Sequence, residues 1–288
     1  MEDTIARWSW RDWNYPTSLR DLSRSAFCFL FPHQWLKRRL ADRRWDETEM
    51  NFLDVMVDPQ RAALDIGANS GKYAARLSAL ARKVYAFEPD RALAAKIGRA
   101  LPRNVEVHAA AVSNRQGVAR LMFPVIAGER ATALASIEPG VLGEAETVSF
   151  EVPTIRLDDF AREPIGFMKI DVEGHEMSVL EGAEGLIARE RPVIMVEAEE
   201  RHRRGAVASV RSFMGARGFD GFFILGDSLK NIDQLTPEMQ SEEMLALADG
   251  LTQMVYVNNF IFVPKEKAAA FAQRMGDALD RAPHAARN

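Results

Sequence analysis

The chain has few of the features that mark a secreted or nucleic-acid-binding protein. Only one of its 288 residues is a cysteine, so no disulfide framework or cysteine-based zinc cluster can form, and a cytoplasmic location is expected. Cys28 lies in the apolar run AFCFLF, where a small buried hydrophobic residue is favoured over a reactive thiol. The net charge of -4 gives no electrostatic footprint for nucleic acid, and none is expected as a partner.

Long apolar segments are also missing. No run reaches the roughly 18 apolar residues of a transmembrane helix, and the first ten residues, MEDTIARWSW, lack the apolar core of a signal peptide. Residues 25–40 join an apolar run to a basic one, which favours a lid or docking segment packed on the main domain. We expect no stable membrane insertion, and a peripheral membrane contact through residues 25–40 stays open.

Aromatic residues are concentrated at the start of the chain. All five tryptophans lie within the first 45 residues, at positions Trp8, Trp10, Trp13, Trp35 and Trp45. The rings either pack on the core as an extension or form a cap that excludes water from a pocket. Residues 1–45 are therefore predicted to be an N-terminal extension or lid.

Strand and helix signals alternate from residue 61 onward. Apolar runs predict strands at 62–66, 83–88, 105–112, 165–172, 191–198, 219–225 and 258–264. Residues 115–155 break the rhythm, because β-like runs follow one another there across Gly and Pro turns, and we interpret them as a β-rich insertion. The alternation elsewhere predicts an α/β fold with a mostly parallel sheet and helices on both faces.

The segment LDIGANSGKY (64–73) is a glycine loop that follows the first predicted strand. A P-loop needs four residues between its glycines and a Ser or Thr after the lysine, whereas only three separate Gly67 from Gly71 and Tyr73 follows Lys72. The dinucleotide fingerprint needs a third glycine that is missing here. Neither a triphosphate nor a dinucleotide is favoured.

The remaining features of the loop favour a nucleoside without phosphates. Asp65 ends the first strand, and Gly67 lets the backbone approach a ligand closely. Glu88 ends the second strand 23 residues after Asp65, a spacing suited to holding ribose hydroxyls. The helix that begins after Gly71 offers free N–H groups to a carboxylate. S-adenosylmethionine has these groups, although Asp65 as a helix cap and Glu88 as a surface acid stay open.

A second unusual run, MKIDVEGHEMSVLEGAEGLI, follows the fourth predicted strand. Asp171 ends that strand at the same sheet edge as the acids above, and Glu173, His175 and Glu176 follow directly. Such a group is costly to pack unless it is paired or solvated. Acids at a helix start would explain Glu173 and Glu176, but they explain Asp171 less well.

Six segments resemble, in order and spacing, the FkbM family of S-adenosylmethionine-dependent methyltransferases: LDIGANSGKYAARLS, VYAFEPD, VEVHAAAVSN, TIRLDDF, MKIDVEGHEMSVLEGAEGLI and NNFIFVP. The resemblance covers roughly residues 46–264, with 115–155 as an insertion and 265–288 as a C-terminal helix and tail. It implies the class I methyltransferase fold, a Rossmann-like seven-stranded sheet with an antiparallel last strand.

The resemblance also implies roles for individual residues. Glu88 would hold the ribose, and Asp171 would lie near the cofactor amine and the methyl group. The cofactor-binding set that it implies is Asp65, Gly67, Ala68, Asn69, Gly71, Tyr73, Glu88, Pro89, Asp90, Val112, Ser113 and Asp171.

The catalytic residues are expected in the second run. His175 is a candidate base because its ordinary pKa lies near neutrality, with Asp171 and Glu173 as rivals or partners; a His175 bonded only to backbone stays open. Glu197, at the end of the fifth strand, is expected to bind substrate hydroxyls. Asp171, Glu173 and Glu197 could hold a divalent metal, but the spacing demands none and none is predicted.

The acceptor is not encoded in a motif. Known members of the resembled family mostly methylate hydroxyls of sugars, polyketides and related metabolites, which implies O-methylation of a small-molecule or glycan acceptor in biosynthesis. An N-methyltransferase acting on an amine and a non-catalytic cofactor-binding scaffold are the alternatives, and a homo-oligomer stays open. The N-terminal arm and residues 115–155 and 226–256 are the candidate walls of the acceptor pocket.

Overall fold

The computed structural model describes residues 30–41, 47–126, 129–130, 135–138, 140–143, 146–160, 163–241, 243–245 and 256–282. The predictions for Cys28 and for most of the aromatic N-terminal segment lie outside these residues. Within them, Trp35 is buried on α2 (Pro32–Ala41) and lies 4.4 Å from the ammonium of Lys96.

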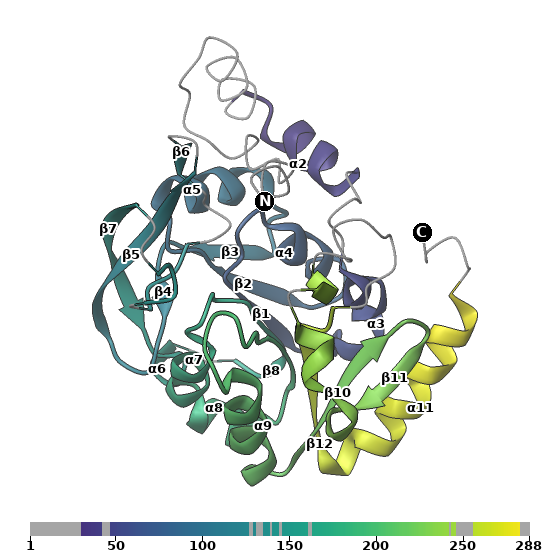
Figure 1. The fold of residues 1–288 in the computed structure, drawn as a ribbon. Coiled ribbons are helices and arrows are strands. Elements are labelled where there is room, and N and C mark those ends of the chain that lie inside the picture. Colours follow the sequence, from purple (N-terminus) through teal and green to yellow (C-terminus); the bar gives the residue numbers. More distant parts are fainter. Residues whose placement is uncertain are drawn as a thin grey trace.

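A central sheet organises the molecule (Figure 1). Its strands are β1 (Ala62–Ile66), β2 (Lys83–Phe87), β3 (Val105–His108), β8 (Ile165–Ile170), β9 (Val193–Glu197), β10 (Phe219–Leu225), β11 (Ser228–Asn231) and β12 (Asn259–Pro264), in the order β11-β10-β12-β9-β8-β1-β2-β3. The five strands from β3 to β9 are parallel, and β12 runs antiparallel to both β9 and β10. The predicted α/β class and the reversed last strand are confirmed.

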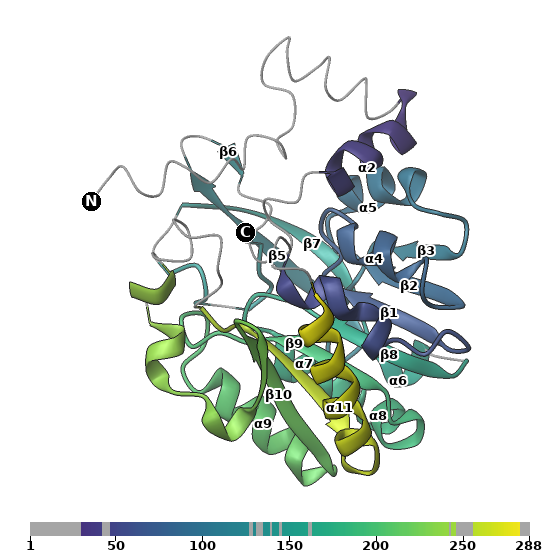
Figure 2. The ribbon, with the colours of Figure 1, turned by 90° about the vertical axis from the view of Figure 1, so that its right-hand side faces the viewer.

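The sheet is covered by helices on both faces, as the two views in Figures 1 and 2 show. One face packs against α3 (Leu53–Met56), α4 (Lys72–Leu77), α5 (Arg91–Ala100) and α11 (Lys265–Arg281), and α2 packs on α5. The other packs against α6 (Leu157–Phe160), α7 (Glu176–Gly182), α8 (Glu184–Glu190) and α9 (Ala206–Ala216). Buried apolar runs in β1, β8 and β12 match a sheet enclosed on both sides.

Two sequence expectations about the sheet were wrong in detail. The sheet has eight strands rather than seven, because residues 228–231 after the turn at Gly226 pair back on β10. The run 105–112 is not one strand: β3 ends at His108, where its pairing with β2 stops, and β4 (Ala111–Val112) joins a second sheet. Periodicity in a continuous apolar run does not show where a strand changes partner.

The second sheet is a projecting arm. It consists mainly of β5 (Gly117–Ile126) and β7 (Thr147–Ile155), which pair antiparallel, with β4 and β6 (Glu129–Arg130) at its edges. Leu121, Phe123 and Val152 form a small core of their own with Ala111. We call the β5–β7 pair with residues 135–138 the arm.

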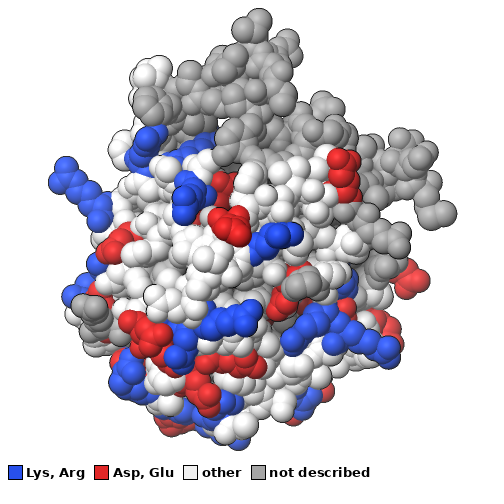
Figure 3. Space-filling model, turned by 90° about the vertical axis from the view of Figure 1, so that its left-hand side faces the viewer, with Lys and Arg blue, Asp and Glu red and all other residues white. Residues whose placement is uncertain are grey.

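Positive and negative side chains are mixed on the face of the molecule that carries the arm. Figure 3 shows Lys and Arg side chains beside Asp and Glu across that face, separated by uncharged areas. Among the described residues, no helix combines the length and apolar composition needed to cross a bilayer. Leu30 and Phe31, just before α2, are exposed.

Candidate functional site

A cavity opens at the carboxyl ends of β1, β2 and β8, where a doubly wound sheet leaves room for a ligand. The loop after β1 and the ends of β2 and β8 form one side of it, and the arm forms the other. Its walls include Gly67, Asn69, Glu88, Val112, Asp171 and His175, together with Leu121 and Ile137 from the arm.

The loop after β1 is held against the end of β8 by its glycine. Gly67 has φ +83°, and a Cβ built on it would lie 1.8 Å from the carbonyl oxygen of Asp171. The backbone N–H groups of Gly67 and Ala68 both donate to the carbonyl of Phe87. Only glycine can therefore join these three strand ends so closely.

Glu88 is a buried carboxylate fixed by backbone amides. Its Oε2 accepts from the N–H of Asn69 and its Oε1 from the N–H of Asp90, each at 2.9 Å. Burial raises the pKa of Glu88 to about 7, and the two amides act in the opposite direction. The two amides thus hold both oxygens of this carboxylate at the wall of the cavity.

Asp65 lies deeper at the same edge. It is 1% exposed, and neither carboxylate oxygen has a hydrogen-bond partner among the described residues. Burial raises its pKa to about 7; Lys169 counteracts this shift and Asp171 adds to it. Asp65 pairs across the strands with Lys169, the buried cation that acts on its carboxylate.

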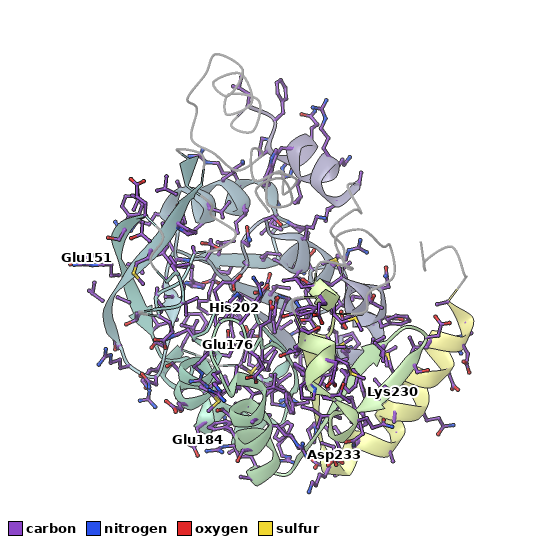
Figure 4. The ribbon with its side chains drawn as sticks, viewed as in Figure 1. Glu151, Glu176, Glu184, His202, Lys230 and Asp233 are labelled. Carbon is purple, nitrogen blue, oxygen red and sulfur yellow. The ribbon has the colours of Figure 1, made fainter. Side chains whose placement is uncertain are left out.

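The turn after β8 contains an acid that pairs with a histidine. Glu173 Oε2 lies 2.9 Å from Nδ1 of His202, a residue of the loop after β9. Burial raises the pKa of Glu173, and His202 partly offsets that shift. Burial would lower the pKa of His202, but the hydrogen bond and charge of Glu173 raise it overall. Figure 4 shows His202 and Glu176 near the middle of the molecule, by contrast with Glu151 on the outer edge of the arm.

Two contacts connect this turn to the arm. Nδ1 of His175 lies 2.8 Å from Oε1 of Glu138, and its Nε2 lies 3.0 Å from Oγ of Ser113. The hydroxyl of Ser136 donates to the carbonyl of Glu173 at 2.6 Å. Both ring nitrogens of His175 are thus engaged within the protein.

A group of charged side chains lies on one face of the sheet beside the cavity. We call Lys169, Asp65, Asp171, Glu47 and Glu197 the acid–lysine cluster. Lys169 is 1% exposed and donates to Oδ2 of Asp171 at 2.6 Å. The four acids are the charges that raise its pKa against the effect of burial. One oxygen from each of Glu47, Asp171 and Glu197 lies within 4.8 Å of the others, a spacing that could hold a metal ion.

The structure distributes the predicted site residues over distinct places. Eight line the cavity: Gly67, Asn69, Glu88, Pro89, Val112, Asp171, Glu173 and His175. Asp90 instead caps α5, accepting from the N–H groups of Ala92 and Leu93, and a Cβ on Gly71 would face Ile97 rather than the cavity. The other predicted residues do not line the cavity. Ala68 is buried, Tyr73 lies against Lys169, and Ser113 contacts His175. Asp65 and Glu197 belong to the acid–lysine cluster.

Sequence reasoning missed several polar residues of the site: Glu47, Glu138, Lys169, His202 and Asn259. Lys169 carried a usable signal, because a lysine within the apolar strand IGFMKI must be buried and needs acidic partners. Asn259 lies in the segment NNFIFVP, which gave no sign of a polar role, and Glu47, Glu138 and His202 lie outside any recognised motif. Only the fold brings these four residues to the site.

Comparison with known proteins gives the class and then the family. The Methyltransferase FkbM domain matches residues 65–220, more than half of the chain. The chain belongs to this family of methyltransferases, and S-adenosylmethionine is its cofactor. No curated protein matches the chain.

Solved structures with similar folds are distant. The FkbM methyltransferase from Methylobacillus flagellatus KT is 16% identical with a TM-score of 0.48, and the match covers 75% of this chain and 47% of that one. The chain thus spans about half the length of that protein. A SAM-dependent methyltransferase from Aquifex aeolicus is 13% identical with a TM-score of 0.40, over 80% of this chain and 96% of that one. A putative methyltransferase from Streptococcus mutans in complex with SAH is 12% identical with a TM-score of 0.40, over 75% of this chain and 95% of that one.

Proposed function

We propose that the protein transfers the methyl group of S-adenosylmethionine to a hydroxyl of a small-molecule or glycan acceptor. The observation that carries the proposal is the pair of buried carboxylates, Glu88 and Asp65, at the ends of adjacent strands beside a glycine loop. These groups suit a ligand with a ribose and an ammonium group and no phosphate. Membership in the FkbM family supports the same reading.

We assign the cofactor contacts by the chemistry of each group. Glu88 accepts hydrogen bonds from the ribose hydroxyls, because its two amide contacts fix both oxygens at the cavity wall. Asp65 and the strand end at Asp171 attract the ammonium of the methionine part. Pro89 and Val112 line the cavity where the adenine would lie, with Ser113 behind them.

The bound cofactor supplies a methyl group on a positively charged sulfur. The acceptor oxygen forms a bond to that methyl carbon as the carbon–sulfur bond breaks, and the hydroxyl proton must leave to a base. The protein contributes position, exclusion of water and uptake of that proton.

We assign proton uptake to Glu173. It lines the cavity, and burial raises its pKa toward the range in which a carboxylate is an effective base. His202 holds Oε2, which leaves Oε1 for the acceptor. His175 is a weaker choice because both ring nitrogens are already bonded, so we assign it to positioning the arm.

Methyl transfer from labelled S-adenosylmethionine to a panel of sugars, polyols and amines tests the proposal. With a hydroxyl acceptor, Glu173→Gln should lower kcat about 10²–10⁴-fold and leave cofactor affinity within a few-fold, whereas His175→Ala should act mainly on cofactor affinity. Glu181→Gln, on the outer side of α7, is the matched control. Transfer to amines alone, undiminished in Glu173→Gln, would establish N-methylation and overturn the assignment.

A further inference from the structure

The acid–lysine cluster has more negative charge than its lysine can balance. Four carboxylates, Asp65, Asp171, Glu47 and Glu197, act on the single ammonium of Lys169. If all are ionised, the formal charge of the cluster is about -3. Buried charges of one sign are relieved by pairing, by protonation or by a bound cation, and burial raises the pKa values of both Asp65 and Glu197.

The strand pairing explains why these side chains meet. Asp65 on β1 pairs with Lys169 on β8, and Asn259 on β12 pairs with Glu197 on β9. Directly paired residues point to the same face of a sheet. Glu47 reaches this face from the segment before η3 (Thr48–Phe52), so it arrives from a different part of the chain.

Each of three carboxylates is held through only one of its oxygens. Oε2 of Glu47 accepts from Tyr73 at 2.5 Å and from Nδ2 of Asn259 at 3.0 Å. Oδ2 of Asp171 accepts from Lys169 at 2.6 Å. The remaining acid, Glu197, is held in the same way.

Oε1 of Glu197 accepts from Nδ2 of Asn258 at 2.7 Å. The second oxygen of Glu197, like those of Glu47 and Asp171, receives no hydrogen bond from the described residues. Donors on one oxygen that leave the other unused are the usual outer contacts of metal-binding carboxylates.

Asn259 gives an independent sign of a ligand. Its side chain is 2% exposed, and its Oδ1 has no hydrogen-bond partner among the described residues. Its Nδ2 bonds Glu47 and its backbone pairs with Glu197, so the side-chain amide is a neighbour of two of the three carboxylates. A buried amide oxygen without a donor is a ligand suited to a hard cation.

We propose that Glu47, Asp171, Glu197 and the amide oxygen of Asn259 bind a divalent cation of the size of Ca²⁺ or Mn²⁺. The three carboxylate oxygens lie within 4.8 Å of one another. Oxygen atoms this close to one another can share one hard divalent cation, for which carboxylate and amide oxygens are the usual protein ligands. The cation site depends on these side chains alone and holds whether the methyl acceptor is a hydroxyl or an amine.

The cation would lie beside the cavity, because Asp171 belongs to both the cavity wall and the cluster. A hydroxyl bound to such an ion loses its proton more readily. With two positive charges added, the formal charge of the cluster falls to about -1.

A titration of the full chain with Mn²⁺ tests the proposal without any methyl transfer. The electron paramagnetic resonance signal of free Mn²⁺ reports how much of the ion is bound. The wild type should remove about one Mn²⁺ per chain, and Ca²⁺ should displace it. Glu197→Gln and Glu47→Gln should each weaken binding at least about tenfold, while Glu151→Gln on the arm should bind as the wild type does.

Asn259 provides a paired test that does not depend on removing a carboxylate. Asn259→Asp should tighten Mn²⁺ binding and Asn259→Leu should weaken it, with thermal unfolding used to select folded variants. No uptake of Mn²⁺ by the folded wild type at millimolar concentration would overturn the proposal. Equal affinity in wild type, Glu197→Gln and Asn259→Asp would overturn the location of the site.

Discussion

At the scale of single residues, the site depends on carboxylates that are buried before any ligand is bound. Burial raises the pKa values of Glu88 and Glu176 to about 7, well above their ordinary value of 4.5. Glu176 also accepts from the N–H of Gly174 at 2.7 Å, which shapes the turn after β8. Such side chains serve ligand binding at a cost to the stability of the empty protein.

The pH dependence of stability follows from these shifts. A carboxyl whose pKa is raised by folding keeps its proton to a higher pH in the folded state than in the unfolded state. Its contribution to the free energy of unfolding is therefore fully present below pH 4.5 and is lost as pH rises through about 7. Without cofactor, the free energy of unfolding should fall across that window. Glu88→Gln should remove part of the fall, on the order of 1–3 kcal/mol.

Thermal unfolding at pH 5 to 8 measures this effect. Glu151→Gln, an exposed acid on the arm, should keep the wild-type slope. A Glu88→Gln protein whose stability falls as steeply as that of the wild type would show that Glu88 does not titrate in this range.

The position of a residue at the cavity could be predicted where the chain carries a local pattern. Glu88 was identifiable because it follows a strand at a fixed distance from the glycine loop. Glu47 and Asn259 were not, because their importance arises from a contact between residues 212 positions apart. His175 was identified as a base from its type alone, and its bonds to Glu138 and Ser113 only became visible in the fold.

At the scale of elements, the loop between β1 and α4 is the most constrained junction. Gly67→Ala would place a methyl group into the carbonyl of Asp171 and would force a positive φ on alanine. We expect a loss of at least about 3 kcal/mol of stability and of cofactor binding.

Gly215→Ala is the matched control for that substitution. Gly215 lies exposed in α9, and a Cβ there would meet nothing within 4 Å, so alanine should stabilise the helix by up to about 1 kcal/mol. Chemical denaturation of both variants measures the contrast. A Gly67→Ala protein as stable as the wild type would contradict the close approach of β1 and β8.

Elements with strong local signals could be predicted from the sequence. The C-terminal helix predicted after residue 264 is of this kind, because Phe271, Met275 and Leu279 lie four residues apart and form the buried face of α11. The break at His108 and the extra strand β11 were missed, since both depend on which strand is the neighbour rather than on local composition.

At the scale of the whole molecule, the cavity is shared between the main sheet and the arm. Leu121, Ser136 and Ile137 of the arm face residues from the ends of β2 and β8 across the cavity. A ligand that fills the cavity should therefore tie the arm to the sheet.

Hydrogen exchange with and without S-adenosylhomocysteine tests that coupling. At 100 times the dissociation constant, openings that release the ligand should slow by about 100-fold, which should appear at residues 121–123 and 135–138. The amides of α11, on the far side of the core, should change least. Unchanged exchange in the arm would show that the ligand does not bridge the two parts.

The central claim is that the cavity binds a nucleoside with an amino-acid part and no phosphate, and calorimetry tests it most directly. S-adenosylhomocysteine should bind one molecule per chain, at least about tenfold more weakly in Glu88→Gln, and NAD should bind far more weakly than either. Tighter binding of NAD than of S-adenosylhomocysteine, or equal S-adenosylhomocysteine affinity in the wild type and Glu88→Gln, would contradict the account.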